Sequence, residues 1–160
     1  YILWAFLEEC KKRLFYLENV AFMTNIAGSP RLQLYFHSKI KLEKSDYWDQ
    51  QLPFKFKAEF CKLLCSSHSL AIEVGRRTNI PRENRTCSLC SSGEVEDEVH
   101  FILKCPKFAQ LRSRYIQYEY LTRPGLNALI SLFINPEKCE QLMKYYFFAS
   151  KQRDRLINLQ

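Results

Sequence analysis

Three cysteines and one histidine within a short polar stretch constrain the fold of this chain most strongly. They follow the pattern Cys-x2-Cys-x9-His-x4-Cys, at Cys87, Cys90, His100 and Cys105. A zinc ion takes four such sulfur and nitrogen ligands in a tetrahedron at about 2.0 to 2.3 Å, and a two-residue gap lets both cysteines of one tight turn reach it. Because protein side chains would fill all four positions, the pattern predicts a structural Zn²⁺ site without an open position for a catalytic water.

The residues around this pattern predict the turn and the helix break that the site requires. Residues 91–93, Ser-Ser-Gly, follow the second cysteine and are typical of a turn. His100 falls in a predicted short helix, residues 98–103, where a nearby carboxylate can bind its second ring nitrogen and fix the tautomer. Cys105 comes five residues later, off the histidine's face of a regular helix. We expect Cys105 to turn back toward the metal, because the proline after it disfavours a helical conformation.

Apolar residues recur every three to four positions along most of the chain, which predicts amphipathic helices and almost no β-structure. We expect helices at residues 1–24, 30–42, 53–65, 70–74, 98–103, 107–120, 126–133 and 136–157, with a capped turn at residues 45–48. Gly75 is expected to end the fourth helix as its C-terminal cap, and residues 76–86 to form a loop. The third helix is expected to bury Phe54, Phe56, Phe60, Leu63 and Leu64.

The predicted fold class is mostly α, in one domain. No linker, repeat or low-complexity tract divides the chain, and 160 residues are enough for one hydrophobic core. We therefore predict a single α-helical domain over residues 1–160. It is a helical bundle with an inserted CCHC zinc knuckle at residues 85–106, made of a short turn or hairpin and a short helix. That segment has too little apolar surface to fold alone, so zinc would supply on the order of 10 kcal/mol of folding free energy.

Charge and cysteine content indicate what kind of partner the chain binds and in which cellular compartment it is found. There are 24 basic and 17 acidic residues, a formal net charge of +7, which favours a polyanionic partner. Four of the seven cysteines lie outside the pattern in apolar helical segments, as expected in a reducing, intracellular compartment, cytoplasmic or nuclear. We find neither a secretory signal pattern nor a run as long as a membrane span, so no membrane partner is expected. The first residue is Tyr1 rather than methionine, so we expect the tail of a larger protein.

Two other groups of candidate residues are assigned structural roles. Cys61, Cys65 and His68 share one helical face, but no fourth ligand is evident, and packing beneath that apolar face is favoured over a second metal site. The acidic residues between 94 and 98 are assigned to a helix start rather than to a hard cation. The motifs of polymerases, nucleotide-binding loops, serine hydrolases and zinc proteases are absent. We therefore expect neither catalysis nor a small-molecule substrate.

Three stretches of sequence together resemble a known family. They are residues 67–76 (SHSLAIEVGR), residues 80–90 (IPRENRTCSLC) and residues 95–106 (VEDEVHFILKCP). The whole is similar to the zinc-binding, reverse-transcriptase-associated region at the C-terminal side of the polymerase in animal LINE-type (non-LTR) retrotransposon polyproteins, over about residues 55–115. The resemblance implies that Cys87, Cys90, His100 and Cys105 are the metal ligands. It also implies an accessory role in holding RNA or target DNA during reverse transcription.

The nucleic-acid contacts are expected outside the acidic loop, because residues 93–98 would repel phosphate. The candidate basic residues before and after the knuckle are Arg76, Arg77, Arg82, Arg85, Lys104, Lys107, Arg112 and Arg114. They can bind the phosphates of RNA or single-stranded DNA, or else serve as solvated surface and carbonyl caps. Tyr115 and Tyr118 can stack on unpaired bases or pack in the core. The alternatives are a zinc-stabilised protein-interaction or self-association module, and a host protein descended from such an element.

Overall fold

The computed structural model describes residues 2–29, 32–38 and 51–159. These residues are mostly helical and form no β-strand, so the mostly α prediction is confirmed. One isolated antiparallel bridge joins Thr86 and Val95. The chain divides into two compact units, residues 1–45 and 46–160, and the expectation of a single domain stays a prediction. No helix in the described ranges combines the length and the apolar character needed to cross a membrane.

The described residues of the first unit form two helices, α1 (Ile2–Ala27) and α2 (Gln33–Ser38). The rings of Phe22 and Tyr35 meet edge to face between them, with centroids 6.2 Å apart. The apolar side chains exposed along α1 are Trp4, Phe6, Leu7, Leu14, Phe15, Tyr16, Leu17 and Val20. The predicted ends of the second helix, at residues 30–31 and 39–42, and the predicted turn at residues 45–48 lie outside the described residues.

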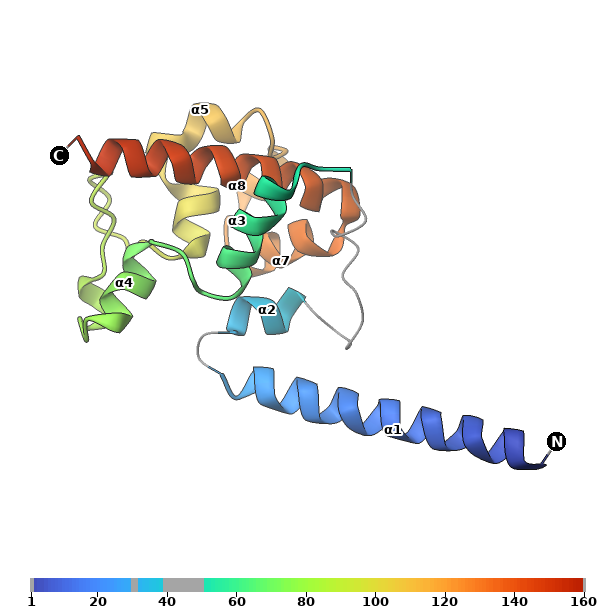
Figure 1. Cartoon of the computed structure of the whole chain (residues 1–160). Helices are drawn as coiled ribbons and strands as arrows, with labels where there is room; N and C mark the ends of the chain where they lie inside the picture. Colours follow the sequence, from blue (N-terminus) through green and yellow to red (C-terminus); the bar gives the residue numbers. More distant parts are fainter. Residues whose placement is uncertain (1, 30–31, 39–50, 160) are drawn as a thin grey trace. The chain divides into compact units, whose positions relative to one another are not determined.

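The core of the second unit forms around its last helix, α8 (Pro136–Ile157), against which α3 (Phe54–Leu64) and α7 (Leu126–Ile134) pack (Figure 1). The predicted start of α8 is confirmed: the side chain of Asn135 accepts a hydrogen bond from the backbone of Lys138 at 3.1 Å, and proline occupies the first turn. The buried side chains of α8 recur at three- and four-residue intervals: Cys139, Leu142, Met143, Tyr145, Tyr146, Ala149 and Arg153.

The third helix departs from prediction at its first residue. Phe56, Phe60, Leu63 and Leu64 are buried as expected, but Phe54 is 72% exposed. Phe54 begins α3, six residues before the Phe60 side chain that packs on Phe133 with centroids 5.3 Å apart. Phe54 points about 160° away from Phe56, which lies two residues on and contacts α8, so the core does not cover Phe54.

Gly75 does not end the fourth helix, which runs as α4 from Ala71 to Arg77. Gly75 is buried within the helix, where an added Cβ would lie 2.5 Å from the Cγ of Arg85. The glycine therefore allows the Arg85 side chain to cross the helix closely, and the helix ends two residues later. The expected loop contains a 3-10 turn, η2 (Arg82–Asn84).

The predicted long helix at residues 107–120 is broken into shorter pieces. It consists of a 3-10 turn, η4 (Pro106–Phe108), followed by α5 (Ala109–Arg112) and, after a turn, α6 (Glu119–Thr122). At the break, Ser113 Oγ donates to the carbonyl oxygen of Gln110 at 2.9 Å. Such a side chain competes with regular helical hydrogen bonding, which amphipathic spacing alone does not reveal.

Candidate metal centre

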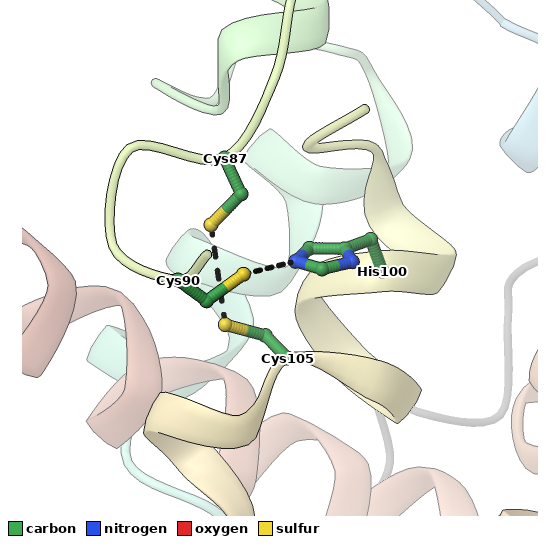
Figure 2. A group of neighbouring side chains, drawn as sticks. All are labelled: Cys87, Cys90, His100 and Cys105. Carbon is green, nitrogen blue, oxygen red and sulfur yellow. Dashed lines mark hydrogen bonds between the residues drawn. The ribbon is translucent and has the colours of Figure 1, made fainter. Parts of the chain in front are cut away.

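The four predicted ligands come from one loop and the helical turn that follows it (Figure 2). Cys87 and Cys90 lie on the loop after η2. Its base is held by backbone hydrogen bonds from Cys87 to Glu94 at 3.0 Å and from Glu96 to Arg85 at 2.9 Å. Gly93, three residues after Cys90, turns the loop back with φ of 69°, a conformation that residues with a side chain rarely adopt. The local sequence therefore folds the loop back so that both cysteines face the next helix.

Two of the distances between donor atoms are close to those of a tetrahedral zinc site. The Sγ atoms of Cys87 and Cys105 are 4.0 Å apart, and Cys90 Sγ lies 3.4 Å from His100 Nε2. Two ligands of one zinc ion would lie about 3.8 Å apart for two sulfurs and about 3.6 Å apart for sulfur and nitrogen. A disulfide would need about 2.05 Å between sulfurs. All four donor atoms lie within 4.8 Å of one another, close enough to hold a metal ion.

A π-helical turn brings the histidine and the third cysteine together. His100–Lys104 form η3, in which the backbone N–H of Cys105 donates to the carbonyl oxygen of His100 at 2.7 Å, five residues back. On a regular α-helix, two residues five apart point about 140° away from each other. The wider turn removes most of this offset. Cys105 then leaves the helical region, with φ of −51° and ψ of 120°, as predicted from the proline that follows it.

Glu94 orients the histidine ring. Its carboxylate lies 3.2 Å from His100 Nδ1 and also accepts from Lys104 Nζ at 3.0 Å. Nδ1 can therefore carry the proton while Nε2 faces Cys90 with a free lone pair, the arrangement a metal-binding imidazole needs. Asp97 fixes the backbone beneath the ring, because its side chain accepts from the His100 N–H at 2.9 Å as a helix cap. The sequence predicted a carboxylate near the ring without saying which one.

The centre is electrostatically coupled even without a metal. A hydrogen bond from Cys105 lowers the pKa of Cys87 to about 3 against the opposing effect of burial, and the bonds from His100 help. The same contact with Cys87, together with burial, raises the pKa of Cys105. The thiolate of Cys87, more than the carboxylate of Glu94, raises the pKa of His100 to about 9. A divalent ion bound to these donor atoms would displace the protons that they carry.

A buried ion pair ties this segment to the core. Both carboxylate oxygens of Glu96 accept from Arg153 on α8, from Nε at 2.7 Å and from Nη2 at 2.6 Å. Glu96 is 1% exposed, and it also accepts from the backbone of Ala71 at 2.7 Å, at the start of α4. One carboxylate therefore joins the loop of the candidate centre, α4 and α8.

A second attachment lies directly on η3. Tyr145 of α8 donates its hydroxyl to the carbonyl oxygen of Phe101 at 3.1 Å. The ring of Phe101 packs edge to face against Phe108 and Tyr146, with centroids 4.9 Å and 6.0 Å away. The residue directly after His100 is thus buried in the core, so the position of the ligand is set by the packing of η3 on α8.

The acidic residues of the loop pair with basic residues of the same chain, and the expectation that the loop repels phosphate stays a prediction. Its ion pairs are Glu94 with Lys104, Glu96 with Arg153 and Asp97 with Arg82, and the Glu98 carboxylate lies 3.1 Å from His68 Nε2. Burial raises the pKa of Glu98, but the hydrogen bond and charge of His68, the backbone hydrogen bond and the charge of Arg82 together outweigh it, so the pKa is lowered. The repulsion of phosphate by this loop is therefore weaker than its composition suggests.

The predicted phosphate-binding residues separate into structural and exposed groups. Arg112 is 5% exposed and donates to the carbonyl oxygens of Ile102 at 2.7 Å and Cys105 at 2.6 Å, so it serves the fold and not a ligand. Arg85 is half-buried, and its side chain donates to two backbone carbonyl oxygens. Arg76 is half-buried and pairs with Glu73. The exposed members are Arg77, Arg82, Lys104, Lys107 and Arg114.

The remaining candidates are placed as follows. Tyr118 is 80% exposed, whereas Tyr115 is half-buried against another ring. Cys65 is exposed and Cys61 half-buried, while His68 is buried on Glu98. Among the described residues, only the Cys87 group brings three or more metal donors together. Cys65 is exposed and not packed beneath the apolar face as expected, and the absence of a second metal site at Cys61 stays a prediction.

Comparison of the chain with known proteins identifies no relative. No protein-family model, no curated protein and no solved structure matches the chain. The role of the centre is therefore inferred from its own residues.

Proposed function

We propose that this chain is a zinc-stabilised, non-catalytic nucleic-acid-binding accessory domain of a retroelement-derived reverse transcriptase polyprotein. The observation that carries the metal assignment is the separation of the donor atoms, 4.0 Å between Cys87 and Cys105 and 3.4 Å between Cys90 and His100. Both lie within a few tenths of an ångström of tetrahedral zinc geometry. Residues 85–106 would then be an inserted CCHC zinc knuckle, consisting of the hairpin turn and η3.

The metal would have a structural role. Cys87, Cys90, His100 and Cys105 would hold it and leave no position for substrate. When bound, zinc supplies positive charge that stabilises three neighbouring thiolates and links the loop to η3. The chain itself supplies the orientation of the imidazole through Glu94 and the attachment to the core through Glu96.

Three observations support nucleic acid as the partner. The net charge is +7, and basic residues around the knuckle are exposed on η2, α4 and the segment after Cys105. Glu94, Glu96 and Asp97 of the acidic loop pair with Lys104, Arg153 and Arg82, which weakens the repulsion of phosphate. The flanking sequence also resembles the corresponding region of LINE-type polyproteins. Together these favour contact with the phosphates of RNA or single-stranded DNA.

The metal assignment is tested by zinc analysis of the purified chain and of matched variants. We expect about one zinc per chain, and well below one in Cys87→Ser and His100→Ala, with loss of amide protection over residues 85–106. Cys65→Ser is the matched control, because Cys65 is an exposed cysteine outside the centre. Zinc-loaded ligand variants with an unchanged melting temperature would contradict the assignment.

The nucleic-acid assignment is tested by the salt dependence of binding to a fluorescent single-stranded RNA and its DNA counterpart. Each phosphate contact contributes about −0.7 to the slope of log K against log salt for single strands. Replacing Arg82, Lys107 and Arg114 by alanine should therefore make the slope shallower by about 2. Lys138→Ala, a change at a half-buried position at the start of α8, should leave the slope unchanged. Absence of binding by the zinc-loaded chain at low salt would remove this function.

A protein-interaction module is the second candidate, and the apolar surface of α1 favours it. The exposed side chains along this helix include Phe6, Leu14 and Leu17, residues that a folded protein normally covers. Light scattering of the zinc-loaded chain separates the two functions. A stable dimer abolished by Leu14→Glu, with no affinity for RNA or DNA, would favour the protein partner.

A further inference from the structure

An aromatic cluster lies at the surface of the second unit, at the junction of α3 and α8. Phe56 of α3 contacts both Phe147 and Phe148 of α8, with ring centroids 4.6 Å and 5.8 Å apart. Tyr115, which follows α5, lies nearly parallel to Phe148, at 23° and 6.1 Å. Phe148 is nonetheless 42% exposed. A large ring is thus backed by other rings and open to solvent, an arrangement that provides a stacking surface.

Two lysines flank this cluster. Lys55 Nζ lies 5.5 Å from the ring centroid of Phe56 and 5.4 Å from that of Phe147, and Lys151 Nζ lies 5.9 Å from the latter. Both lysines are exposed. The nearby carboxylate of Glu59 is already held by Lys62 at 2.9 Å and lies 3.5 Å from Lys151. The cluster therefore carries net positive charge beside its open aromatic face.

We infer that this surface, formed by Tyr115, Phe147, Phe148, Lys55 and Lys151 and here called the aromatic platform, binds single-stranded nucleic acid. An unpaired base stacks on the open face of Phe148, and the lysines contact the phosphates on either side. Stacking on aromatic side chains within a basic surface is the common mode of single-strand binding. A protein partner fits less well, because lysine is depleted at the buried centre of protein interfaces.

The candidate metal centre connects to the aromatic platform through Arg112. This buried side chain donates to the carbonyl oxygens of Ile102 and Cys105, one in η3 and one a predicted ligand. Tyr115 follows Arg112 by three residues, and its backbone N–H donates to the Arg112 carbonyl oxygen at 3.1 Å. Fixing Cys105 on a metal would therefore also fix the segment that carries Tyr115. This inference rests on the proposed function and specifies its surface and the strandedness of its partner.

The test measures binding of the zinc-loaded chain to a 12-nucleotide single-stranded RNA by fluorescence anisotropy. The variants are Phe148→Ala, Phe148→Leu and the double change Lys55→Ala with Lys151→Ala. Leucine keeps apolar contact but removes the stacking face. We expect about 5- to 100-fold weaker binding for both Phe148 variants, and a shallower salt slope for the lysine variant alone. Ile134→Ala, an exposed apolar change at the end of α7, serves as the control and should bind as the unaltered chain does.

An abasic oligonucleotide of the same length isolates stacking from phosphate contact. The unaltered chain should lose affinity for it, and Phe148→Ala should cause no further loss. Melting curves of all variants report whether the fold is kept, which we expect because 42% of Phe148 is already exposed to solvent. The same series is run on a duplex, which offers no unpaired bases and should not distinguish Phe148→Ala from the unaltered chain.

Three results would overturn the aromatic platform, and they separate it from the proposed function. If the Phe148 variants bind RNA normally while the Arg82, Lys107 and Arg114 triple variant does not, the function stands and the platform is wrong. If the zinc-loaded chain binds no RNA at low salt, both fail. If Phe148→Ala dissociates a dimer in light scattering and leaves RNA affinity unchanged, the surface is a protein interface.

Discussion

Glu96→Gln should be among the most destabilising single changes in this chain, although Glu96 lies in what the sequence presents as an acidic surface loop. The carboxylate is 1% exposed and receives two hydrogen bonds from Arg153, at 2.7 Å and 2.6 Å, and one from the backbone of Ala71. Glutamine keeps the volume but removes the negative charge. The guanidinium of Arg153 would then remain buried without a counter-charge.

The expected cost follows from that burial. Removing one partner of a buried ion pair destabilises proteins by about 3 to 5 kcal/mol, because the other charge stays desolvated and unpaired. This is a large fraction of the roughly 5 to 15 kcal/mol that typically holds a domain folded. At about 4 °C per kcal/mol for a unit of this size, the melting temperature should fall by about 12 to 20 °C. The surface pair of Arg82 and Asp97, by contrast, should contribute at most about 1 kcal/mol.

The measurement is urea unfolding followed by circular dichroism at saturating zinc. Glu83→Gln is the matched control, since Glu83 is an exposed glutamate in the same region. The double change Glu96→Leu with Arg153→Leu tests the electrostatic cause directly. Removing both charges should recover at least about 2 kcal/mol relative to the sum of the single changes.

The reasoning is wrong if Glu96→Gln costs no more than Glu83→Gln. It is also wrong if the double variant shows no coupling, because the loss would then reflect packing and not an uncompensated charge. Zinc content measured on the same samples shows whether the loop of the candidate centre loosens when its attachment to α8 is lost.

Three further predictions follow from single contacts. Glu94→Gln should weaken zinc affinity about 10- to 100-fold in a competition titration, because the hydrogen bond that orients His100 is weakened; an unchanged affinity would show that Glu94 does not position the ring. Gly75→Ala should cost about 1 to 3 kcal/mol in urea unfolding, because the new Cβ displaces Arg85, whereas Gly125→Ala, in open space, should cost nothing of this kind. Because the pKa of Glu98 is lowered in the folded chain, its ionised form stabilises the fold at pH values above the ordinary carboxyl pKa. This stabilisation is lost as the pH falls through the lowered pKa of the folded chain. The stability difference between the unaltered chain and Glu98→Gln should therefore shrink as pH falls below about 4.5, and a difference that grows would contradict the sign.

Much of the candidate centre could be predicted because its signals are local. The spacing of Cys87 and Cys90, the glycine of the turn and the proline after Cys105 each act within a few residues. The local conformation that each signal predicts therefore does not depend on how the rest of the chain folds. The same is true of the Asn135 cap of α8, which depends on its own first turn.

The positions that sequence reasoning missed depend on distant neighbours. Arg112 looks like an exposed basic residue, yet it is buried because the carbonyl oxygens of Ile102 and Cys105 turn toward it. The π turn of η3 was not predicted, because amphipathic spacing does not distinguish it from one turn of α-helix. Glycine is common at helix ends, so the sequence assigns Gly75 to a cap. Its contact with Arg85, which belongs to a later loop, becomes visible only in the folded chain.

The sequence by itself determined which atoms can hold a metal and where the chain must turn to present them, since both are set by residue type and short spacing. Only the tertiary structure decided which charges are free. Glu96 and Arg153 are 57 residues apart and meet because the loop and α8 pack against the same core. Whether a charge is buried and paired or exposed to a partner depends on such packing between distant segments. The local sequence around each charged residue does not reveal that packing.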